Sequence, residues 1–335
     1  MRKRQWLTAL ILVLSTGIVS AEKIALAIHG GAGTITPEKM TPEKEKAIRA
    51  TLKSSLEAGY EVLQQGGSSL DAVIKSVEIL EDSPLFNAGI GAVYTHDETH
   101  ELDASIMVGD TLEAGAVSGV KRVKNPLALA RVVMEYSPHV MLSGTGAEEF
   151  AKLQGIELVD NKIFNTPFRL NALRRAQIKT SMLDNPTNLD RLETNYKVGT
   201  VGAVALDKMG VISAGTSTGG MTNKRFGRIG DAPIIGAGTY ADNNSCAISA
   251  TGHGEYFIRY NVAADICARV KYQDKTIVEA GDVVINQVLK EAGGTGGVII
   301  VDREGNISMP FNTSGMYRGS IDADGKVTVA IYKDR

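Results

Sequence analysis

Apolar residues recur at helical spacing in the N-terminal third of the chain. The first such stretch begins at Thr41-Pro42, a typical N-cap followed by the first helical position, and ends at Gly66-Gly67. Its apolar positions fall on one face of a helix: Ala47, Ile48, Leu52, Leu56, Tyr60 and Leu63. Further helices are predicted from Ser69, from Asn125-Pro126, over 256–270 and over 276–292.

Short apolar runs bounded by turn sequences predict strands. Residues 24–28 form one such run, predicted as a buried strand that ends in the glycine-rich turn 29–33. Three pairs of runs around Asp/Gly turns predict hairpins over 201–216, 298–309 and 321–331. Hairpins make a sheet antiparallel, and no glycine fingerprint for dinucleotides follows a strand and opens a helix. Helices that cover packed, largely antiparallel sheets are therefore expected, rather than a doubly wound nucleotide-binding fold.

The composition excludes several functional classes. The 335 residues include 36 Lys and Arg against 38 Asp and Glu, a net charge of −2, whereas nucleic-acid-binding proteins are usually basic. Hydrophobic residues make up 43% of the chain, which is ample for a core. Two cysteines are too few for a disulfide-rich scaffold or an all-cysteine zinc site. We expect a soluble domain that binds no nucleic acid.

The N-terminus has the organisation of a secretory signal peptide. Basic residues at 2–4 precede the apolar run 7–14, and small residues at 19–21 follow it. The residues at 15–17 keep the apolar run well below the roughly 20 residues that span a bilayer. We expect removal of residues 1–21 and a secreted or periplasmic protein with no membrane association after processing. The alternative is an uncleaved membrane anchor.

A polar segment precedes the strongest predicted strand. Residues 155–198 are rich in Asn, Arg, Lys and Thr and show little periodicity. Long unpatterned segments inside a compact domain are uncommon and are usually functional or disordered. The segment ends abruptly at Gly199-Thr200, where the strand begins. We interpret this junction between a mobile segment and a rigid strand as a place where the chain is cut.

Hydroxyl-bearing and small residues concentrate after this junction. They form TSTGG at 216–220, RIGD at 228–231 and TGHGE at 251–255. Each motif alone has a structural interpretation, because Thr and Ser are common at strand ends. Arg228 and Asp231 would ordinarily form a surface ion pair that contributes little to stability.

Taken in order, the motifs resemble a known family. They are IHGGAG at 28–33, SPLFNAGIG at 83–91, GTVGAVA at 199–205, TSTGGMTNK at 216–224, PFNT at 310–313 and GMYR at 315–318. This series is similar to the plant-type L-asparaginase/isoaspartyl peptidase family of N-terminal-nucleophile hydrolases. The resemblance covers essentially the whole chain after the signal peptide.

The resemblance implies an α/β (α+β) fold, a four-layer αββα sandwich in one structural domain. It also implies an inactive precursor that cleaves itself between Gly199 and Thr200. The products would be an α chain, 22–199, with a mobile polar segment at about 155–199, and a β chain, 200–335. Gly199 suits this step because a residue without Cβ tolerates strained backbone. Thr200 would then carry both the nucleophilic hydroxyl and an α-amine, with a reference pKa of about 7.7–8.0, that acts as its base.

The same resemblance assigns roles around the nucleophile. Thr218 would orient the Thr200 hydroxyl, and Asn87 is expected to lie nearby. The hydroxyl of Thr251 and the N–H of Gly252 would form the oxyanion hole, in which each donor typically contributes about 2.7–4 kcal/mol.

Substrate and ion sites follow from the resemblance too. Arg228 would bind the α-carboxylate of the substrate, and Asp231 and the Gly254 carbonyl would bind its ammonium group. A structural sodium ion would be held mainly by backbone carbonyls of Leu80, Glu81, Ser83, Phe86, Ala88 and Ile90. No cofactor is expected for catalysis, and the assembly would be an (αβ)2 dimer of heterodimers.

The expected activity is hydrolysis of L-asparagine and β-aspartyl (isoaspartyl) dipeptides. One alternative is a glycosylasparaginase-like preference for glycan-linked asparagine, which the signal peptide favours slightly. Another is a secreted amino-acid-binding protein, which would need Arg228 and Asp231 but no cleavable junction at Thr200.

The histidines and cysteines receive structural interpretations. The histidines are scattered without metal-ligand spacing, at His29, His96, His100, His139 and His253. Cys246 is expected on a core strand and Cys267 on a helix, where they form either one disulfide or two buried thiols.

Overall fold

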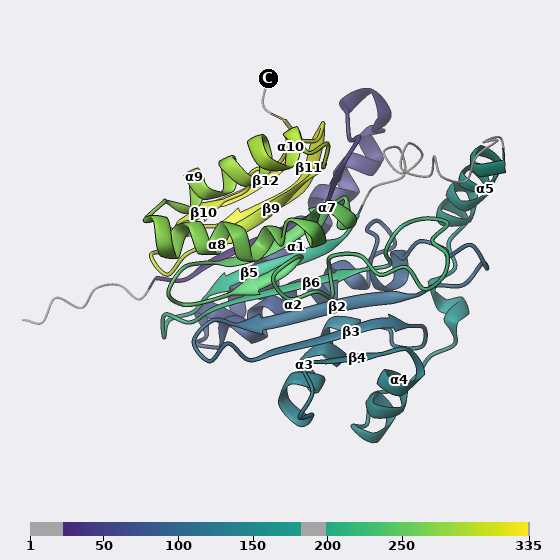
Figure 1. Cartoon of the computed structure of the whole chain (residues 1–335), viewed down its shortest axis with the longest axis horizontal. Helices are drawn as coiled ribbons and strands as arrows, with labels where there is room; N and C mark the ends of the chain where they lie inside the picture. The colour runs from purple at the N-terminus through teal and green to yellow at the C-terminus, as the bar shows by residue number, and fades with distance from the viewer. Residues whose placement is uncertain (1–22, 182–198, 334–335) are drawn as a thin grey trace, which may run out of the picture.

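The computed structural model describes residues 23–181 and 199–333, and its strands form two stacked sheets (Figure 1). The larger sheet contains, in spatial order, β12 (Val327–Tyr332), β11 (Gly315–Ile321), β1 (Ala25–Gly33), β5 (Val201–Leu206), β6 (Ile212–Thr218), β2 (Leu102–Val108), β3 (Ala114–Val120) and β4 (Met141–Ser143). The smaller sheet contains β10 (Ile307–Ser308), β9 (Gly296–Val301), β8 (Ala247–Gly252) and β7 (Thr239–Ala241). Neighbouring strands are antiparallel, except that β3 and β4 are parallel.

Helices cover the outer face of each sheet. The larger sheet carries α1 (Pro42–Gln64), α2 (Ser69–Glu81), α3 (Pro126–Tyr136) and α4 (Gly144–Leu153). The smaller sheet carries α8 (Val262–Gln273), α9 (Ile277–Asp282) and the π-helical turn η5 (Val283–Val288), which continues into α10 (Leu289–Glu291). Two helical layers thus enclose two sheets, and the predicted αββα sandwich is confirmed (Figure 1).

The remaining helical elements complete the described chain. They are η1 (Pro37–Lys39), η2 (Gly89–Gly91), η3 (Asn161–Phe164), α5 (Pro167–Ser181) and α7 (Gly254–Arg259). Within the described ranges, no helix is long and apolar enough to cross a membrane.

The alternation of side chains along β1 explains the layers. Leu26 and Ile28 are fully buried in the core beneath the helices, whereas Ala25 and Ala27 are buried in the core between the two sheets. Successive side chains of a strand point to opposite faces, so a strand that is apolar on both faces must lie inside the molecule. This burial explains why 24–28 reads as a continuous apolar run.

The expected glycine-rich turn at 29–33 is wrong. β1 continues to Gly33, and its pairing with β11 shifts register between His29 and Gly31, where a bulge forms. A bulge kinks a strand without ending it, and glycine accommodates the positive φ of 112° at Gly31.

The predicted single helix over 256–270 is also wrong. The structure has two helices there, α7 and α8, which are separated at Asn261, where the backbone has a left-handed φ of 49°.

The polar segment 155–198 is more ordered than expected in its first half. It contains η3 and α5, and α5 lacks a clear apolar face because polar and apolar residues are interspersed around it. The expected mobility of the second half concerns residues 182–198, which lie outside the described residues, as do the signal peptide 1–21 and its cleavage position.

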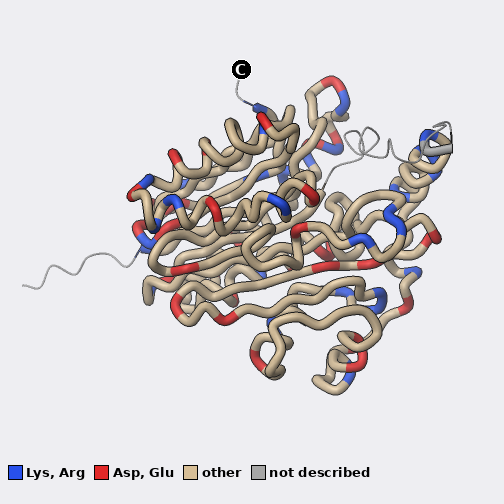
Figure 2. Tube along the Cα trace, viewed as in Figure 1, with Lys and Arg blue, Asp and Glu red and all other residues tan. Residues whose placement is uncertain are grey.

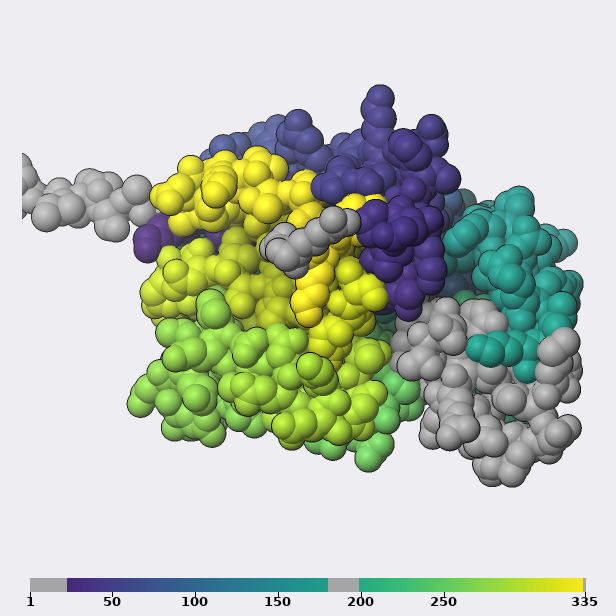
Figure 3. Space-filling model, turned by 90° about the horizontal axis from the view of Figure 1, so that it is seen from above, coloured from purple at the N-terminus to yellow at the C-terminus, as the bar shows by residue number. Residues whose placement is uncertain are grey.

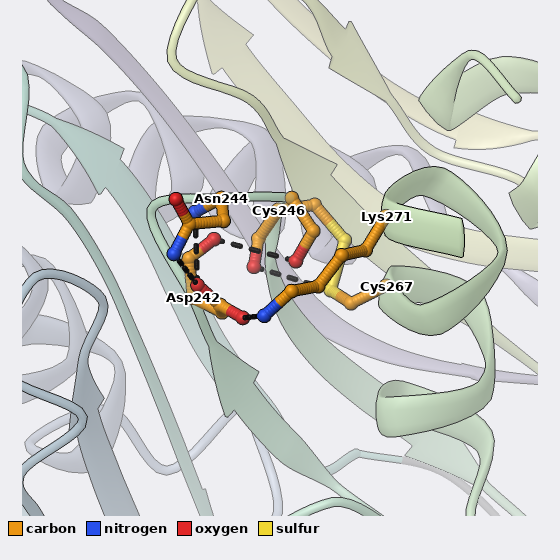
Figure 4. Close-up of a disulfide and its surroundings, with 6 residues drawn as sticks. Asp242, Asn244, Cys246, Cys267 and Lys271 are labelled. Atoms are coloured by element: carbon orange, nitrogen blue, oxygen red, sulfur yellow. Dashed lines mark hydrogen bonds and ion pairs between the residues drawn. A yellow bond between two sulfur atoms is a disulfide. The ribbon is translucent and has the colours of Figure 1, made fainter. Parts of the chain in front are cut away.

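The two cysteines form a disulfide, which decides between the alternatives left by the sequence. Cys246 lies immediately before β8, and Cys267 lies on α8, so the bond connects the smaller sheet to the helix that covers it (Figure 4). An ion pair lies beside the disulfide: the Lys271 amine of α8 is 2.8 Å from a carboxylate oxygen of Asp242 (Figure 4).

Candidate active site

A small cavity lies where the start of β5 meets the ends of β6 and β8. Eight residues predicted to act in catalysis or substrate binding line it: Asn87, Thr200, Thr218, Arg228, Asp231, Thr251, Gly252 and Gly254. Its volume is only about 40 Å³, and Gly199 forms part of its wall. Antiparallel pairing places the start of β5 against the end of β6, with Val201 opposite Ser217, so Thr200 and Thr218 become neighbours.

Thr218 holds the hydroxyl of Thr200. The Thr200 hydroxyl donates a hydrogen bond to Thr218 Oγ1 over 3.1 Å. The same oxygen accepts the backbone N–H of Gly220 at 3.1 Å, which fixes the position of the Thr218 side chain. The Thr200 Oγ1 atom is therefore oriented by a side chain that is itself held by the backbone.

His29 anchors the other end of Thr200. Its Nδ1 lies 3.0 Å from the Thr200 carbonyl oxygen, and because a carbonyl only accepts, Nδ1 carries the proton. Burial lowers the pKa of His29 to about 3, so the ring is neutral, and Nε2 accepts the hydroxyl of Ser249 at 2.8 Å. Ser249 Oγ in turn lies 2.6 Å from Thr216 Oγ1. The interpretation of His29 as purely structural missed its contact with Thr200. The position of His29 at the start of the glycine-rich motif was the feature of the sequence that could have indicated a role near the site.

The backbone at Gly199 is tightly enclosed. Gly199 has a φ of 128°, and a Cβ there would lie 2.6 Å from the Cβ of Asn87. A Cβ at Gly31 would collide with the Cα of Gly199. The carbonyl oxygen of Gly199 accepts the backbone N–H of Asn87 at 2.9 Å, so a hydrogen-bond donor polarises this carbonyl. The same Asn87 is fixed by its side chain, which donates to the Gly220 carbonyl at 2.7 Å.

Arg228 presents one edge of its guanidinium group to the cavity. The other edge is bound by Glu255, with Nε and Nη2 each 2.9 Å from a carboxylate oxygen. A Cβ at Gly230 would lie 2.9 Å from Nη1 and a Cβ at Gly254 2.8 Å from Nη2, so a side chain at either position would require the guanidinium group to shift. A carboxylate matches the free edge bidentately. Glu255 was not assigned from the sequence; its position next to Gly254 was the available signal.

The Asp231 carboxylate lies near the Arg228 guanidinium group, and one of its oxygens is unpaired in the described residues. The side chain is 5% exposed, and its Oδ2 has no hydrogen-bond partner in the described residues. Burial raises the pKa of Asp231 to about 6, while the nearby Arg228 opposes the rise. Above that pH the carboxylate is charged, and a buried carboxylate oxygen without a hydrogen-bond donor favours binding of a group such as an ammonium ion. Arg228 and Asp231 together suit a ligand that carries both a carboxylate and an ammonium group.

Thr251 has a hydroxyl proton available for a ligand. Its Oγ1 accepts the backbone N–H of Ala32 at 3.3 Å, and its side chain is buried at the cavity wall beside Gly252. A donor in this position can bind an oxygen that gains negative charge.

The predicted sodium loop follows α2 and folds back on itself. A Cβ at Gly91 would collide with the Phe86 carbonyl oxygen and lie 2.9 Å from that of Ser83, and a Cβ at Gly89 would collide with that of Glu81. The Phe86 and Ser83 carbonyl oxygens thus both lie close to Gly91, and the Glu81 carbonyl oxygen lies close to Gly89. Oxygen donors of this kind suit a hard cation. The Glu81 carboxylate is turned away, since it accepts the Ser217 hydroxyl at 2.6 Å.

Comparison with known proteins identifies relatives over nearly the whole chain. A family model described as asparaginase matches residues 22–331. The isoaspartyl peptidase of Escherichia coli is 49% identical over 317 residues, which cover 93% of this chain and 97% of that protein. A probable isoaspartyl peptidase/L-asparaginase 2 of Arabidopsis thaliana is 41% identical over 92% of this chain and 99% of its own length. The isoaspartyl peptidase/L-asparaginase of Xenopus laevis is 41% identical over 92% and 96%.

Proposed function

The chain belongs to the asparaginase family, and from this membership and the geometry of its cavity we propose that it hydrolyses β-aspartyl (isoaspartyl) dipeptides and L-asparagine. One observation carries the assignment to this cavity. The free edge of Arg228 and the unpaired oxygen of Asp231 lie in the same cavity as the Thr200 hydroxyl. Both substrates share an aspartyl head group with a carboxylate and an ammonium group, and in both the bond to be broken is the side-chain amide.

Thr200 is the proposed nucleophile. Its hydroxyl attacks the amide carbonyl of the substrate, while Thr251 and the N–H of Gly252 bind the oxygen as it becomes negative. The α-amine of Thr200, once free, takes the hydroxyl proton and passes it to the departing amine. Water then hydrolyses the aspartyl ester, which releases aspartate and restores the hydroxyl. Thr218 supports this chemistry by orienting the nucleophile.

Release of the α-amine requires cleavage between Gly199 and Thr200. We propose that the Thr200 hydroxyl attacks the Gly199 carbonyl, that the C–N bond breaks to an ester, and that water hydrolyses this ester. The donor from Asn87 to that carbonyl supports the step, because it stabilises the developing negative charge. The volume of about 40 Å³ supports it too, since ligand pockets typically measure roughly 300–1,000 Å³ and Gly199 must leave to admit a substrate. The products are chains 22–199 and 200–335.

Export, the sodium ion and assembly are further parts of the proposal. The signal-peptide pattern supports export to the periplasm or the exterior, and the family match begins at residue 22, directly after the expected cleavage position. The loop after α2 brings the Ser83 and Phe86 carbonyl oxygens close to Gly91 and the Glu81 carbonyl oxygen close to Gly89, which supports a sodium ion that would stabilise the loop carrying Asn87. An (αβ)2 dimer is proposed from the family resemblance.

A substrate panel tests the proposal against its alternatives. Purified protein is assayed with L-asparagine, a β-aspartyl dipeptide and glycosylasparagine, and its chains are resolved on a denaturing gel. We expect two chains and hydrolysis of the first two substrates. Preferential hydrolysis of glycosylasparagine would favour the glycosylasparaginase-like alternative. A single uncleaved chain that binds an amino acid without hydrolysis would favour the binding protein.

A further inference from the structure

A second cavity, which we call the Arg169 cavity, adjoins the active site. It has a volume of about 250 Å³, and its wall includes Thr34 and Thr222. Thr222 directly follows Met221, and Thr34 lies two residues after Ala32; both Met221 and Ala32 line the active-site cavity. Neighbouring residues of the same two chain segments therefore line both cavities.

The Arg169 cavity is lined by cations. Its basic residues are Lys39, Lys44, Arg169 and Arg175, and no acidic residue of the described chain is among its lining residues. Basic residues recur along α5 in Figure 2, and in Figure 3 the teal segment that contains α5 lies beside the purple early part of the chain. A cavity between two such segments attracts an anion.

Arg169 is the group that most needs an anionic partner. It is only 6% exposed, and its Nε donates to the carbonyl oxygen of Gly91 at 2.7 Å. No carboxylate of the described residues forms an ion pair with it. Burial lowers the pKa of Arg169 to about 10, and the group remains charged at neutral pH. A buried charge that is not paired is costly, and such groups are normally paired or bind a ligand.

Lys44 is held beside Arg169 by an aromatic ring. Its amine lies 4.7 Å from the ring centre of Phe168, and the guanidinium carbon of Arg169 lies 5.4 Å from the same centre. Burial, together with the charge of Arg169, lowers the pKa of Lys44. Two cations are thus kept close together against their mutual repulsion, which one carboxylate between them would relieve.

A chain of contacts connects Arg169 with the neighbourhood of Thr218 in the active site. In the active-site cavity, Arg228, Asp231 and Gly254 contact one another, and the aspartyl head group belongs with them. Gly31, Asn87 and Gly199 form a separate set of contacts beyond Thr200. The Gly91 that binds Arg169 is followed by Ala92, which packs against Gly219 next to Thr218.

We propose that the Arg169 cavity binds the α-carboxylate of the leaving residue of a β-aspartyl dipeptide. The inference rests on the proposed function, because it places the second half of the same substrate. In an isoaspartyl dipeptide, the residue after the scissile amide ends in a free carboxylate. L-Asparagine releases ammonia instead and has no group that reaches the cavity. Arg169 and Lys44 therefore determine specificity for dipeptides over asparagine.

The test compares two substrates in single variants. Arg169→Gln and Lys44→Gln are assayed with β-aspartyl-leucine and with L-asparagine, and Lys46→Gln, an exposed lysine of the same helix, is the matched control. We expect the KM for the dipeptide to rise about tenfold or more in Arg169→Gln and about threefold in Lys44→Gln, with the KM for asparagine unchanged. Lys46→Gln changes neither value. β-Aspartyl-leucinamide, which lacks the carboxylate, should bind wild type about as weakly as β-aspartyl-leucine binds Arg169→Gln.

The outcomes separate this inference from the proposed function. Wild type that hydrolyses neither substrate overturns the function itself. Wild type that hydrolyses both, with dipeptide and amide equally good or with both variants unaffected, overturns the Arg169 cavity alone. Equal losses for asparagine and dipeptide would mean that Arg169 only maintains the fold, and this would overturn the inference as well. Lys44 is partly exposed, so Lys44→Gln keeps the test available if Arg169→Gln fails to fold.

Discussion

The backbone N–H of Asn87 lies 2.9 Å from the carbonyl oxygen of Gly199, the residue that precedes the proposed nucleophile. Asn87 is itself fixed by three further hydrogen bonds, to Val93, Gly219 and Gly220. The donor is therefore rigid and already in place before any charge develops on that oxygen, which is the requirement for electrostatic stabilisation of a transition state.

Gly31→Ala should block maturation. A methyl group at Gly31 would collide with the Cα of Gly199, and the backbone there has a φ of 112°, so the junction must move away from Asn87. We expect uncleaved precursor on a denaturing gel. Gly66→Ala is the control, because Gly66 also has a positive φ, of 85°, but has no atom within 4 Å of the added Cβ. Normal cleavage of Gly31→Ala would show that the close approach to Gly199 is unimportant.

Arg228→Ala should separate maturation from catalysis. The chain itself holds the Gly199–Thr200 bond in place, whereas a substrate must be captured from solution through its carboxylate. We expect two chains on a gel but a loss of at least about tenfold in kcat/KM for both substrates. Arg225→Ala, on the same loop and exposed, should behave as wild type. Near-normal kcat/KM in Arg228→Ala would remove Arg228 from the substrate site.

The affinity for substrate should fall in acid. Burial raises the pKa of Asp231 to about 6, so its carboxylate is charged above that pH and protonated below it. A protonated carboxyl group no longer attracts the substrate ammonium, and KM for asparagine should rise as the pH falls through about 6. The pH profile of KM measures this, and Asp231→Asn should have a high KM without that rise. A wild-type KM that is constant from about pH 5 to 7 contradicts this role.

The disulfide should lie within one product chain. Cys246 and Cys267 both follow Thr200, so the two chains should separate on a gel without reductant. The bond closes a loop with a separation of 21 residues, and the double variant Cys246→Ala/Cys267→Ala should lose about 2–4 kcal/mol of stability, measured by denaturant unfolding, and keep its activity. Co-migration of the two chains until reductant is added would contradict this pairing.

The sequence predicts elements whose pattern is local. The α1 helix has an N-cap at Thr41 that accepts the N–H of Lys44, together with one apolar face, and its bounds agree closely with expectation. The β5–β6 hairpin is signalled by its turn. By contrast, β2 contains Asp103 and Ser105, which are fully buried, so its polar residues mask the strand pattern. Burial of this kind depends on partners far away in the chain, such as the Ala232 carbonyl that accepts the Ser105 hydroxyl.

The site shows the same division between motif and context. Thr200, Thr218 and Arg228 stand in motifs that resemble the family, and the structure brings them to one cavity. His29 and Thr200 are separated by 171 residues in the sequence. They meet because β1 pairs with β5, and the spacing of residues along the chain does not reveal that pairing. Similarly, Arg169 lies on a helix without a clear apolar face, and its relation to the site exists only through the fold.

The central claim is that Thr200 is the nucleophile both of cleavage and of hydrolysis. Intact mass and dipeptide hydrolysis measured on Thr200→Ala test it most directly, with Thr200→Ser and wild type beside it. We predict a β chain that begins at Thr200 in wild type, one uncleaved and inactive chain in Thr200→Ala, and partial cleavage and activity in Thr200→Ser, which keeps a hydroxyl. A Thr200→Ala protein that still splits between residues 199 and 200, or still hydrolyses the dipeptide, would contradict the account.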